Sequence, residues 1–294
     1  MNTSPQISIL ISVYEQLEYT KKCLDNVRET LEGKISYEII MVDDHSSPKT
    51  VSELKRLVQS PHKLLLNSQR KGFAHNNNLA AKEASAPFLC LLNNDVFVQG
   101  DWLAPMLKVF EDYPDVGMVG NVQLRYNSNQ YDHMGVVFAP QGNPRHFGQF
   151  FWHRPFKTEV KQWSAVTAAC CVCKKEKFEE MKGFDEIFVN GCEDVDLCLR
   201  MSIAGYRNFV AHDSIVEHVK GATAGRKIHN VRNARILDDR WGEYIRSNQS
   251  VSDQKLHAWT YIWRFLLRPW SSNLNKFIEA LLIRYNFKKL SPPQ

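Results

Sequence analysis

Two short runs of carboxylate and amide side chains stand where they could bind a ligand or a metal ion. Asp43 and Asp44 follow a predicted buried strand at 38–42, and carboxylates at such a place can accept hydrogen bonds from a base or a ribose hydroxyl. Asn-Asn-Asp at 93–95 follows the apolar run 89–92. One carboxylate beside amide oxygens suits a hard divalent cation held mostly by diphosphate oxygens and water. Each run could equally build an ordinary turn, because Asp and Asn favour turns.

A third acidic run, Glu-Asp-Val-Asp at 193–196, opens a predicted helix at 193–204. The helix dipole stabilises anions at this end, and an ionised carboxylate there can act as a general base toward an alcohol. Apolar neighbours such as Leu197 and Leu199 favour a partly buried cluster over a solvated helix cap. His218 ends a predicted strand at 215–217 and could bind a metal ion or a phosphate, although a single histidine is more often structural.

The elements that must position these runs alternate between short β-rich segments and segments of helical period. Strands are predicted at 7–13, 38–42, 63–66 and 88–92, and helices at 17–31, 51–58 and 74–84. This alternation indicates βαβ units around a doubly wound parallel sheet. Ligands of such sheets bind beyond the carboxyl ends of the strands, so the polar segments after residues 13, 42 and 92 should line one site.

The second half of the chain is less regular. A helix is predicted at 101–110 and strands at 116–122 and 164–173, whereas the aromatic-rich stretch 123–163 predicts strands and loops over the site. Near the C-terminus, Leu256, Trp259, Trp263, Leu266 and Trp270 recur at steps of three and four, as in an amphipathic helix. Pro269 separates this helix from a second apolar stripe at 274–285.

Six segments, taken in order, resemble successive motifs of family 2 glycosyltransferases. They are 9–15 (ILISVYE), 42–47 (VDDHSS), 72–79 (GFAHNNNL), 91–96 (LLNNDV), 183–188 (GFDEIF) and 193–200 (EDVDLCLR). Each is weak alone, but six in the family's order are a strong signal. The resemblance implies an α/β GT-A fold, with a Rossmann-like, mostly parallel central sheet flanked by helices. We expect a catalytic domain at 1–225 and a C-terminal helical extension at 226–294.

The activity implied by this resemblance is inverting transfer of a sugar from a UDP-, dTDP- or GDP-linked donor to a hydroxyl of a saccharide or lipid-linked saccharide. The resemblance places donor contacts at Ser12, Tyr14, Asp43, Asp44, Asn76, Asn78, Asn94 and Asp95. It makes Asp194 the general base and gives Glu193 a part in positioning the acceptor. It also implies Mg²⁺ or Mn²⁺ on Asp95, with His218 reaching the metal or the diphosphate.

The sequence departs from the family pattern at two places. Asn93 and Asn94 replace acids of the metal motif, which predicts weaker metal binding. Arg240 and Trp241 match the end of the QxxRW motif of processive synthases, but Leu237 stands in place of Gln, so we expect one sugar per transfer. Two alternatives remain. A nucleotidyltransferase would normally carry a basic loop near the first strand, which 12–19 lacks; a noncatalytic nucleotide-sugar-binding protein would not need Asp194.

Composition narrows the functional class. The 294 residues are 44% hydrophobic and 23% charged, as in ordinary globular proteins, which excludes disordered and collagen-like chains. Residues 255–294 contain seven basic groups and one acid, so the preceding 254 residues carry 30 basic and 31 acidic groups. A neutral body argues against nucleic acid as a partner.

The basic C-terminal segment, 255–294, has two alternative roles. Its helices could dock on the catalytic body or form a dimer, or they could lie on an anionic membrane surface. The odd number of cysteines, seven, predicts reduced thiols rather than a disulfide framework. No signal peptide precedes the first predicted strand, and no apolar run approaches the roughly 18 residues of a membrane span. We therefore expect a cytoplasmic protein, with a peripheral position at the inner face of the membrane as the alternative placement of the tail.

Overall fold

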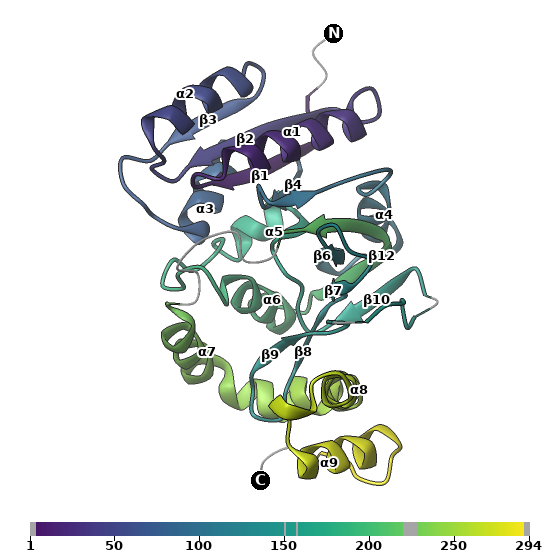
Figure 1. Cartoon of the computed structure of the whole chain (residues 1–294). Coiled ribbons are helices and arrows are strands. Elements are labelled where there is room, and N and C mark those ends of the chain that lie inside the picture. Colours follow the sequence, from purple (N-terminus) through teal and green to yellow (C-terminus); the bar gives the residue numbers. More distant parts are fainter. Residues whose placement is uncertain (1–3, 150, 157, 220–227, 291–294) are drawn as a thin grey trace.

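A mixed β-sheet forms the centre of the protein in a computed structural model that describes residues 4–149, 151–156, 158–219 and 228–290 (Figure 1). Its main path runs β10-β12-β6-β11-β4-β1-β2-β3, with β5 paired to β12 and β7 to β6. These strands are β1 Ile7–Val13, β2 Tyr37–Asp43, β3 Lys63–Leu66, β4 Phe88–Leu92, β5 Val96–Phe97, β6 Val116–Arg125, β7 Tyr131–His133, β10 Val160–Trp163, β11 Cys170–Lys174 and β12 Arg207–His218. A separate hairpin pairs β8 Val136–Phe138 with β9 Pro144–His146.

Helices cover both faces of this sheet and extend it at the C-terminal end (Figure 1). They are α1 Leu17–Leu31, α2 Pro48–Leu57, α3 Phe73–Glu83, α4 Ala104–Asp112, α5 Lys175–Glu180, α6 Glu193–Ile203, α7 Asn230–Tyr244, α8 Ser250–Leu267 and α9 Leu274–Arg284. A π-helical segment, Ile245–Gln249, joins α7 to α8. None of the described helices is both long and apolar enough to cross a membrane.

The N-terminal half of the sheet is parallel, because β1 pairs in parallel with β2 and β4, and β2 with β3. Successive side chains of β1 enter two different buried clusters. Ile9 and Ile11 pack in the cluster that contains residues of α1, and Leu10 packs in the one that contains residues of α3. Burial on both faces explains why these strands are continuous apolar runs in the sequence. The predicted doubly wound α/β half is confirmed.

The second half supplies antiparallel strands, which the sequence pattern predicted less well. β11 lies antiparallel between β4 and β6, and it begins at Cys170, so 164–169 is a connecting segment and not part of a strand. β12 is much longer than the predicted 215–217, and its pairing with β6 shifts register between Ala211 and Ile215. This irregularity carries the end of β12 to β5, next to the end of β4.

The C-terminal helices pack on the body through α8. Trp259 lies 5.8 Å from Phe147 and Trp263 lies 5.4 Å from Phe151, measured between ring centroids. Asp253 accepts hydrogen bonds of 2.8 Å from the Phe138 amide and the Ser164 hydroxyl. The predicted stripe at 256–270 therefore divides, with its first half docked and Trp270 exposed. The predicted domain boundary at 225 falls in 220–227, outside the described residues.

Candidate active site

A pocket lies at the carboxyl ends of β1, β2 and β4, the edge at which the sequence places its polar runs. It is lined by Ser12, Tyr14, Asp44, Arg70, Phe73, Asn93, Asn94, Asp95, Thr167, Ala168, Ala169, Asn190, Glu193 and Asp194. The pocket thus brings together seven predicted site residues from four separate segments. Asp43, Asn76, Asn78 and His218 are not part of its lining.

Asp44 organises the loop that leads from β3 into α3. Its carboxylate accepts hydrogen bonds from the backbone amides of Lys71 (2.7 Å) and Gly72 (3.1 Å) and from the side chain of Asn67 (3.1 Å). The side chain is buried, so most of its hydrogen-bonding capacity is used in holding this loop. Asp43, its neighbour, accepts from the Ser46 amide at 3.1 Å and is buried behind the pocket. Asp43 therefore shapes the turn and does not reach the cavity.

Arg70 is a pocket residue that the sequence analysis missed. Its guanidinium carbon lies 3.7 Å from the centroid of the Tyr14 ring, a cation–π contact, and its Nε lies 3.9 Å from Asp44. The sequence feature that marks Arg70 is a basic pair, Arg70 and Lys71, directly before Gly72 of the third motif. A guanidinium on the wall of a polar pocket suits a phosphate group.

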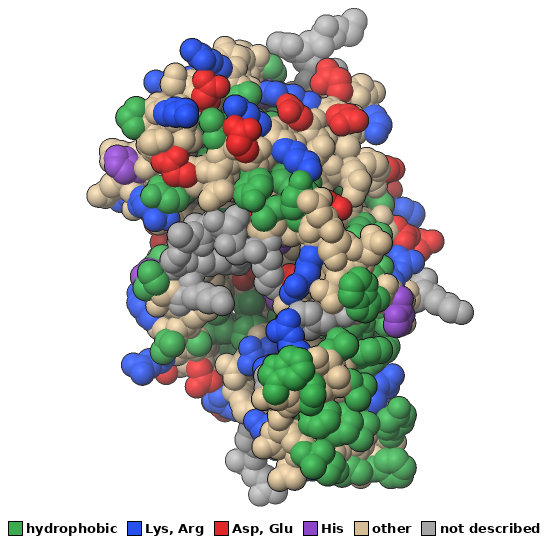
Figure 2. Space-filling model, in the orientation of Figure 1, with side chains coloured by type: hydrophobic (Ala, Val, Ile, Leu, Met, Phe, Trp, Pro, Cys, Tyr) green, Lys and Arg blue, Asp and Glu red, His purple; other side chains and the backbone are tan. Residues whose placement is uncertain are grey.

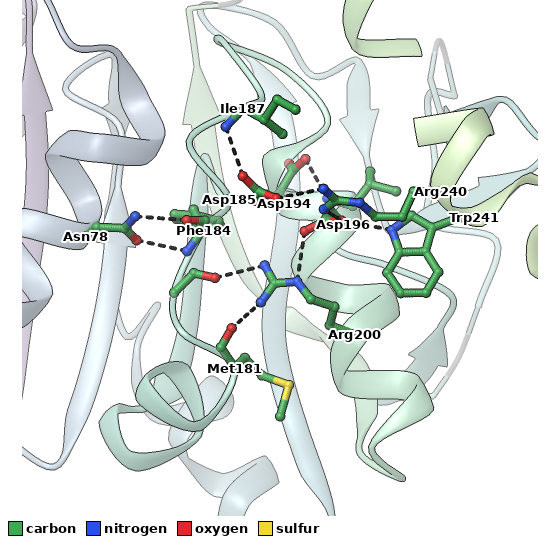
Figure 3. Close-up of polar contacts among 12 residues, drawn as sticks. Asn78, Met181, Phe184, Asp185, Ile187, Asp194, Asp196, Arg200, Arg240 and Trp241 are labelled. Carbon is green, nitrogen blue, oxygen red and sulfur yellow. Dashed lines mark hydrogen bonds and ion pairs between the residues drawn. The ribbon is translucent and has the colours of Figure 1, made fainter. Parts of the chain in front are cut away.

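Asn76 and Asn78 turn to different sides of α3. Asn76 donates to the Ser12 hydroxyl (2.8 Å) and accepts from Asn67 (2.7 Å), so it supports Ser12 from behind the lining. Asn78 instead exchanges two hydrogen bonds with the backbone of Phe184, at 2.8 and 2.9 Å (Figure 3). Residues two apart on a helix lie about 200° apart around its axis. The sequence predicts that Asn78 approaches the donor, but the side-chain amide of Asn78 instead holds the loop before α6.

Asp95 and His218 meet through strand pairing. β5 and β12 pair His218 with Val96, which leaves His218 Nε2 3.4 Å from Asp95 Oδ1. Nδ1 of the same ring lies 3.0 Å from Gln123 Oε1, and Nε2 is buried without a hydrogen-bond partner among the described residues. A buried imidazole nitrogen aimed at a carboxylate fits a divalent cation. No group of three or more His, Cys, Asp or Glu residues suited to a metal occurs in the described part of the chain.

The first turn of α6 carries the two predicted catalytic acids. Asp194 accepts hydrogen bonds from the amides of Ala168 (3.1 Å) and Val195 (2.9 Å), and Glu193 accepts from the Gly191 amide (2.5 Å). Ala168 belongs to the segment that is not a strand, and this segment also accepts from the Asn93 amide through Ala169 (2.8 Å). The segment 164–169 therefore contacts both Asp194 and the 93–95 run and fixes the position of one relative to the other. Cys192 precedes the helix in a left-handed conformation, φ 73°, which is strained for a residue with a side chain.

Asp196, the third acid of the run, is fully buried beneath the site and does not line it. It accepts hydrogen bonds from Arg200 (2.9 Å), Arg240 (2.8 Å) and the Trp241 indole (2.8 Å), and Arg240 also pairs with Asp185 (2.8 Å), as Figure 3 shows. These contacts clamp α7 to α6. The Arg240-Trp241 pair thus supports the helix that carries Asp194.

Comparison with known families matches residues 8–181 to a model described as "Glycosyl transferase family 2". The chain belongs to glycosyltransferase family 2. Its matched region includes the ends of β1, β2 and β4 and the Asp44 loop, which line the pocket. Family membership and the names of its relatives support a glycosyltransferase enzyme over a nucleotidyltransferase or a noncatalytic binding protein.

Curated relatives include sugar-transferring enzymes. The O-antigen biosynthesis protein RfbC of Myxococcus xanthus is 30% identical over 69% of this chain and 16% of its own length. The rhamnosyltransferase WbbL of Escherichia coli is 27% identical over 68% of this chain and 78% of its own length. An uncharacterised protein, y4gI of Sinorhizobium fredii, is 28% identical over 80% of this chain and 27% of its own length. The chain therefore spans about a quarter or less of y4gI and RfbC.

Solved structures share the fold. GalNAc-T7 with UDP, GalNAc and Mn²⁺ superposes with a TM-score of 0.67 at 17% identity, covering 98% of this chain and 56% of that one. The mannosyltransferase PcManGT of Pyrobaculum calidifontis, in complex with GDP-Man and Mn²⁺, superposes with a TM-score of 0.61 at 21% identity. The match covers 98% of this chain and 77% of that one. The GT-A fold expected from the sequence is confirmed.

Proposed function

We propose that this glycosyltransferase moves a single sugar, with inversion, from a nucleotide-diphosphate sugar to a hydroxyl of a saccharide or lipid-linked saccharide. The observation that carries the proposal is that one pocket gathers Tyr14 and Asp44, Asp95, and Asp194. Under this proposal they would provide, in order, a place for the nucleotide, a place for a diphosphate with its cation, and a base. The two solved structures named above contain UDP or GDP-Man together with Mn²⁺, which supports a nucleotide-sugar donor and a divalent metal.

The donor would lie with its nucleotide at the ends of β1 and β2. Tyr14 offers a ring for the base and Ser12 a hydroxyl held in place by Asn76. Arg70, stacked on Tyr14, would contact the diphosphate and offset part of the repulsion from the surrounding acids. These contacts suit uridine, thymidine and guanosine diphosphates alike, because none of the contacts reads a base edge.

Asp95 and His218 are the residues that would hold Mg²⁺ or Mn²⁺. With the Nδ1 proton of His218 donated to Gln123, the Nε2 lone pair faces Asp95. Such a cation, when bound, neutralises charge on the departing nucleoside diphosphate. Two protein ligands leave the remaining positions to the diphosphate and water, as is usual for Mg²⁺ beside phosphates.

Asp194 would take the proton of the acceptor hydroxyl. The acceptor oxygen forms a bond to the anomeric carbon from the face opposite the diphosphate, the bond to the diphosphate oxygen breaks, and the proton passes to Asp194. The N-terminus of α6 and the Ala168 amide stabilise and orient this carboxylate. Glu193 lies beside it in the lining and would position the acceptor.

Single transfer is supported by the surroundings of Leu237. This side chain, at the place of the Gln in QxxRW, is buried in an apolar cluster with Phe138, Val195 and Leu199. Arg240 and Trp241 are likewise occupied with Asp196. A cytoplasmic location belongs to the same proposal, because all seven cysteines are free thiols, as expected in a reducing compartment.

The test is a donor and acceptor screen with Asp194→Asn. Wild-type protein with a metal ion should release nucleoside diphosphate from one sugar donor and form a product of inverted anomeric configuration by NMR. Asp194→Asn should lower transfer about 10³-fold or more, as expected for a lost general base. Donor affinity by calorimetry should change little.

Asp101→Asn, an exposed acid away from the pocket, is the matched control. Retained configuration in the product would contradict the inverting mechanism. Transfer by Asp194→Asn at the rate of the control would remove Asp194 from the role of base.

A further inference from the structure

The outer side of α8 and α9 exposes large apolar side chains. Figure 2 shows hydrophobic side chains gathered at the C-terminal end of the molecule, over these two helices. The exposed apolar residues are Leu266, Trp270, Leu274, Ile278, Leu282 and Phe287. We call this set the α8–α9 apolar face. Trp270 is 82% exposed and Phe287 is 81% exposed. The contact between the two helices uses other residues, Ala258, Ala280 and Ile283, so the apolar face is not needed to hold α9 in place.

Beside this face lies a basic cavity of about 590 Å³, between α8, α9 and the β8–β9 hairpin. Three cations line it, namely Arg145, Arg264 and Lys276, and none of them has an ion pair or a side-chain hydrogen bond among the described residues. The acid in the lining, Glu279, is already paired with Lys288 at 2.6 Å. Unpaired cations around a hollow suit an anion.

The electrostatics of the cavity agree with this. The pKa of Arg145 is lowered, first because its guanidinium is partly removed from water and second because the positive charge of Arg264 is nearby. Burial, then Arg145 and Lys276, lower the pKa of His257 to about 4, so this ring is neutral near neutral pH. Trp270 belongs to both the cavity lining and the apolar face, which makes the two features continuous.

We propose that the α8–α9 corner docks this enzyme on a bilayer that contains anionic phospholipids, with a lipid phosphate in the basic cavity and the apolar face at the acyl boundary. Stable attachment to a membrane surface generally needs both an apolar and an electrostatic contribution, and this corner supplies both. A second copy of the chain is the other possible cover. A two-fold contact would bring the same unpaired cations together, and like charges across an interface are unfavourable, so charge favours the lipid.

Vesicle flotation tests this independently of sugar transfer, because it needs neither donor nor acceptor. The full chain should float with vesicles of phosphatidylcholine and phosphatidylglycerol, bind weakly to phosphatidylcholine alone, and be released by high salt. Arg264→Gln/Lys276→Gln should weaken binding to the anionic vesicles about 30-fold, because each basic residue near such a surface contributes roughly fivefold. Trp270→Ser/Leu274→Ser should weaken it as well.

The matched control is Lys34→Gln/Lys49→Gln, which removes the same charge from exposed positions near α1 and α2, at the opposite end of the molecule. All of the substituted side chains are exposed, so each variant should melt within a few degrees of wild type. Failure of the wild type to bind anionic vesicles, or equal losses in the control and the tail variants, would overturn the proposal. So would a dimer, seen by light scattering, that Trp270→Ser/Leu274→Ser dissociates without changing vesicle binding; that result would assign the face to a second copy.

Discussion

Two side chains at the proposed donor end of the pocket, Asp44 and Arg70, differ in how firmly they are held. Asp44 is fixed by two backbone amides and an asparagine, so it acts mainly as the frame of its loop. Arg70 rests on the face of Tyr14 and is about half exposed, at 47% of its side-chain surface. It can therefore adjust to a ligand, and its charge makes it the better candidate for a direct contact with phosphate.

Arg70→Ala should raise the donor KM about tenfold to a hundredfold, with a smaller change in kcat. The reason is that a charge-assisted hydrogen bond to a phosphate contributes about 1.5–3 kcal/mol to binding. Steady-state kinetics and calorimetry with the nucleoside diphosphate would measure this. Lys71→Ala is the control, because Lys71 contributes its backbone amide to Asp44 and its side chain is exposed outside the lining. Equal effects of the two substitutions would exclude a specific contact.

At the scale of elements, the α6–α7 clamp connects the fold to the chemistry. The proposed catalytic acids occupy the first turn of α6, and Asp196, in the same turn, is the residue to which α7 is tied. Loss of the clamp should loosen the helix that presents Asp194. The clamp therefore has both a structural and a positioning effect.

Arg240→Ala should lower the free energy of unfolding by about 1–3 kcal/mol and reduce kcat, because the buried Asp196 loses one of its charged partners. Arg235→Ala, at an exposed position of the same helix, should change it by less than about 0.5 kcal/mol. Urea unfolding followed by circular dichroism would measure both. Equal stability of the two variants would mean that Arg200 and Trp241 alone satisfy Asp196.

Over the whole molecule, α8 completes the core of the catalytic body and is not a loose appendage. Trp259 and Trp263 pack into the cluster that also holds strands of the central sheet, and Asp253 bonds to β8 and to the segment before β11. The predicted helical extension is thus partly integral to the body. The outer face of α8 and α9, by contrast, stays exposed.

The docking of α8 should give stability a characteristic pH dependence. Burial raises the pKa of Asp253 to about 6 from an ordinary 3.8, although Ser164 and the Phe138 amide oppose the shift. A raised pKa of an acid means that its favourable contribution is present below about pH 4 and is lost as the pH rises through 6. Asp253→Asn should therefore gain about 2–3 kcal/mol relative to wild type between about pH 4 and pH 7.

Urea unfolding of both proteins at the two pH values would measure this gain. The gain is measured relative to wild type because the lowered pKa of His257 changes the stability of both proteins in the same pH range, with the opposite sign. Asp239→Asn, an exposed acid of α7, controls for the loss of one negative charge. A difference between Asp253→Asn and wild type that does not vary with pH would contradict the assignment.

The sequence by itself determined the four strands β1 to β4, the three helices between them and the edge at which the site forms, but not the short β5. Buried parallel strands require apolar runs, and polar residues directly after Val13, Val42 and Leu92 must meet because the carboxyl ends of parallel strands share one edge. The acids 193–194 were found because a helix start is marked locally in the sequence.

Tertiary structure alone decided which way individual side chains face. The same helix turns Asn76 toward Ser12 and Asn78 toward Phe184, and a loop held by Asp44 brings Arg70 over Tyr14. An amphipathic stripe shows that Trp259, Trp263 and Trp270 share a face, but it does not show that the first two dock on Phe147 and Phe151 while the third stays exposed. Such choices depend on contacts between residues far apart in the chain, and local spacing carries no record of those contacts.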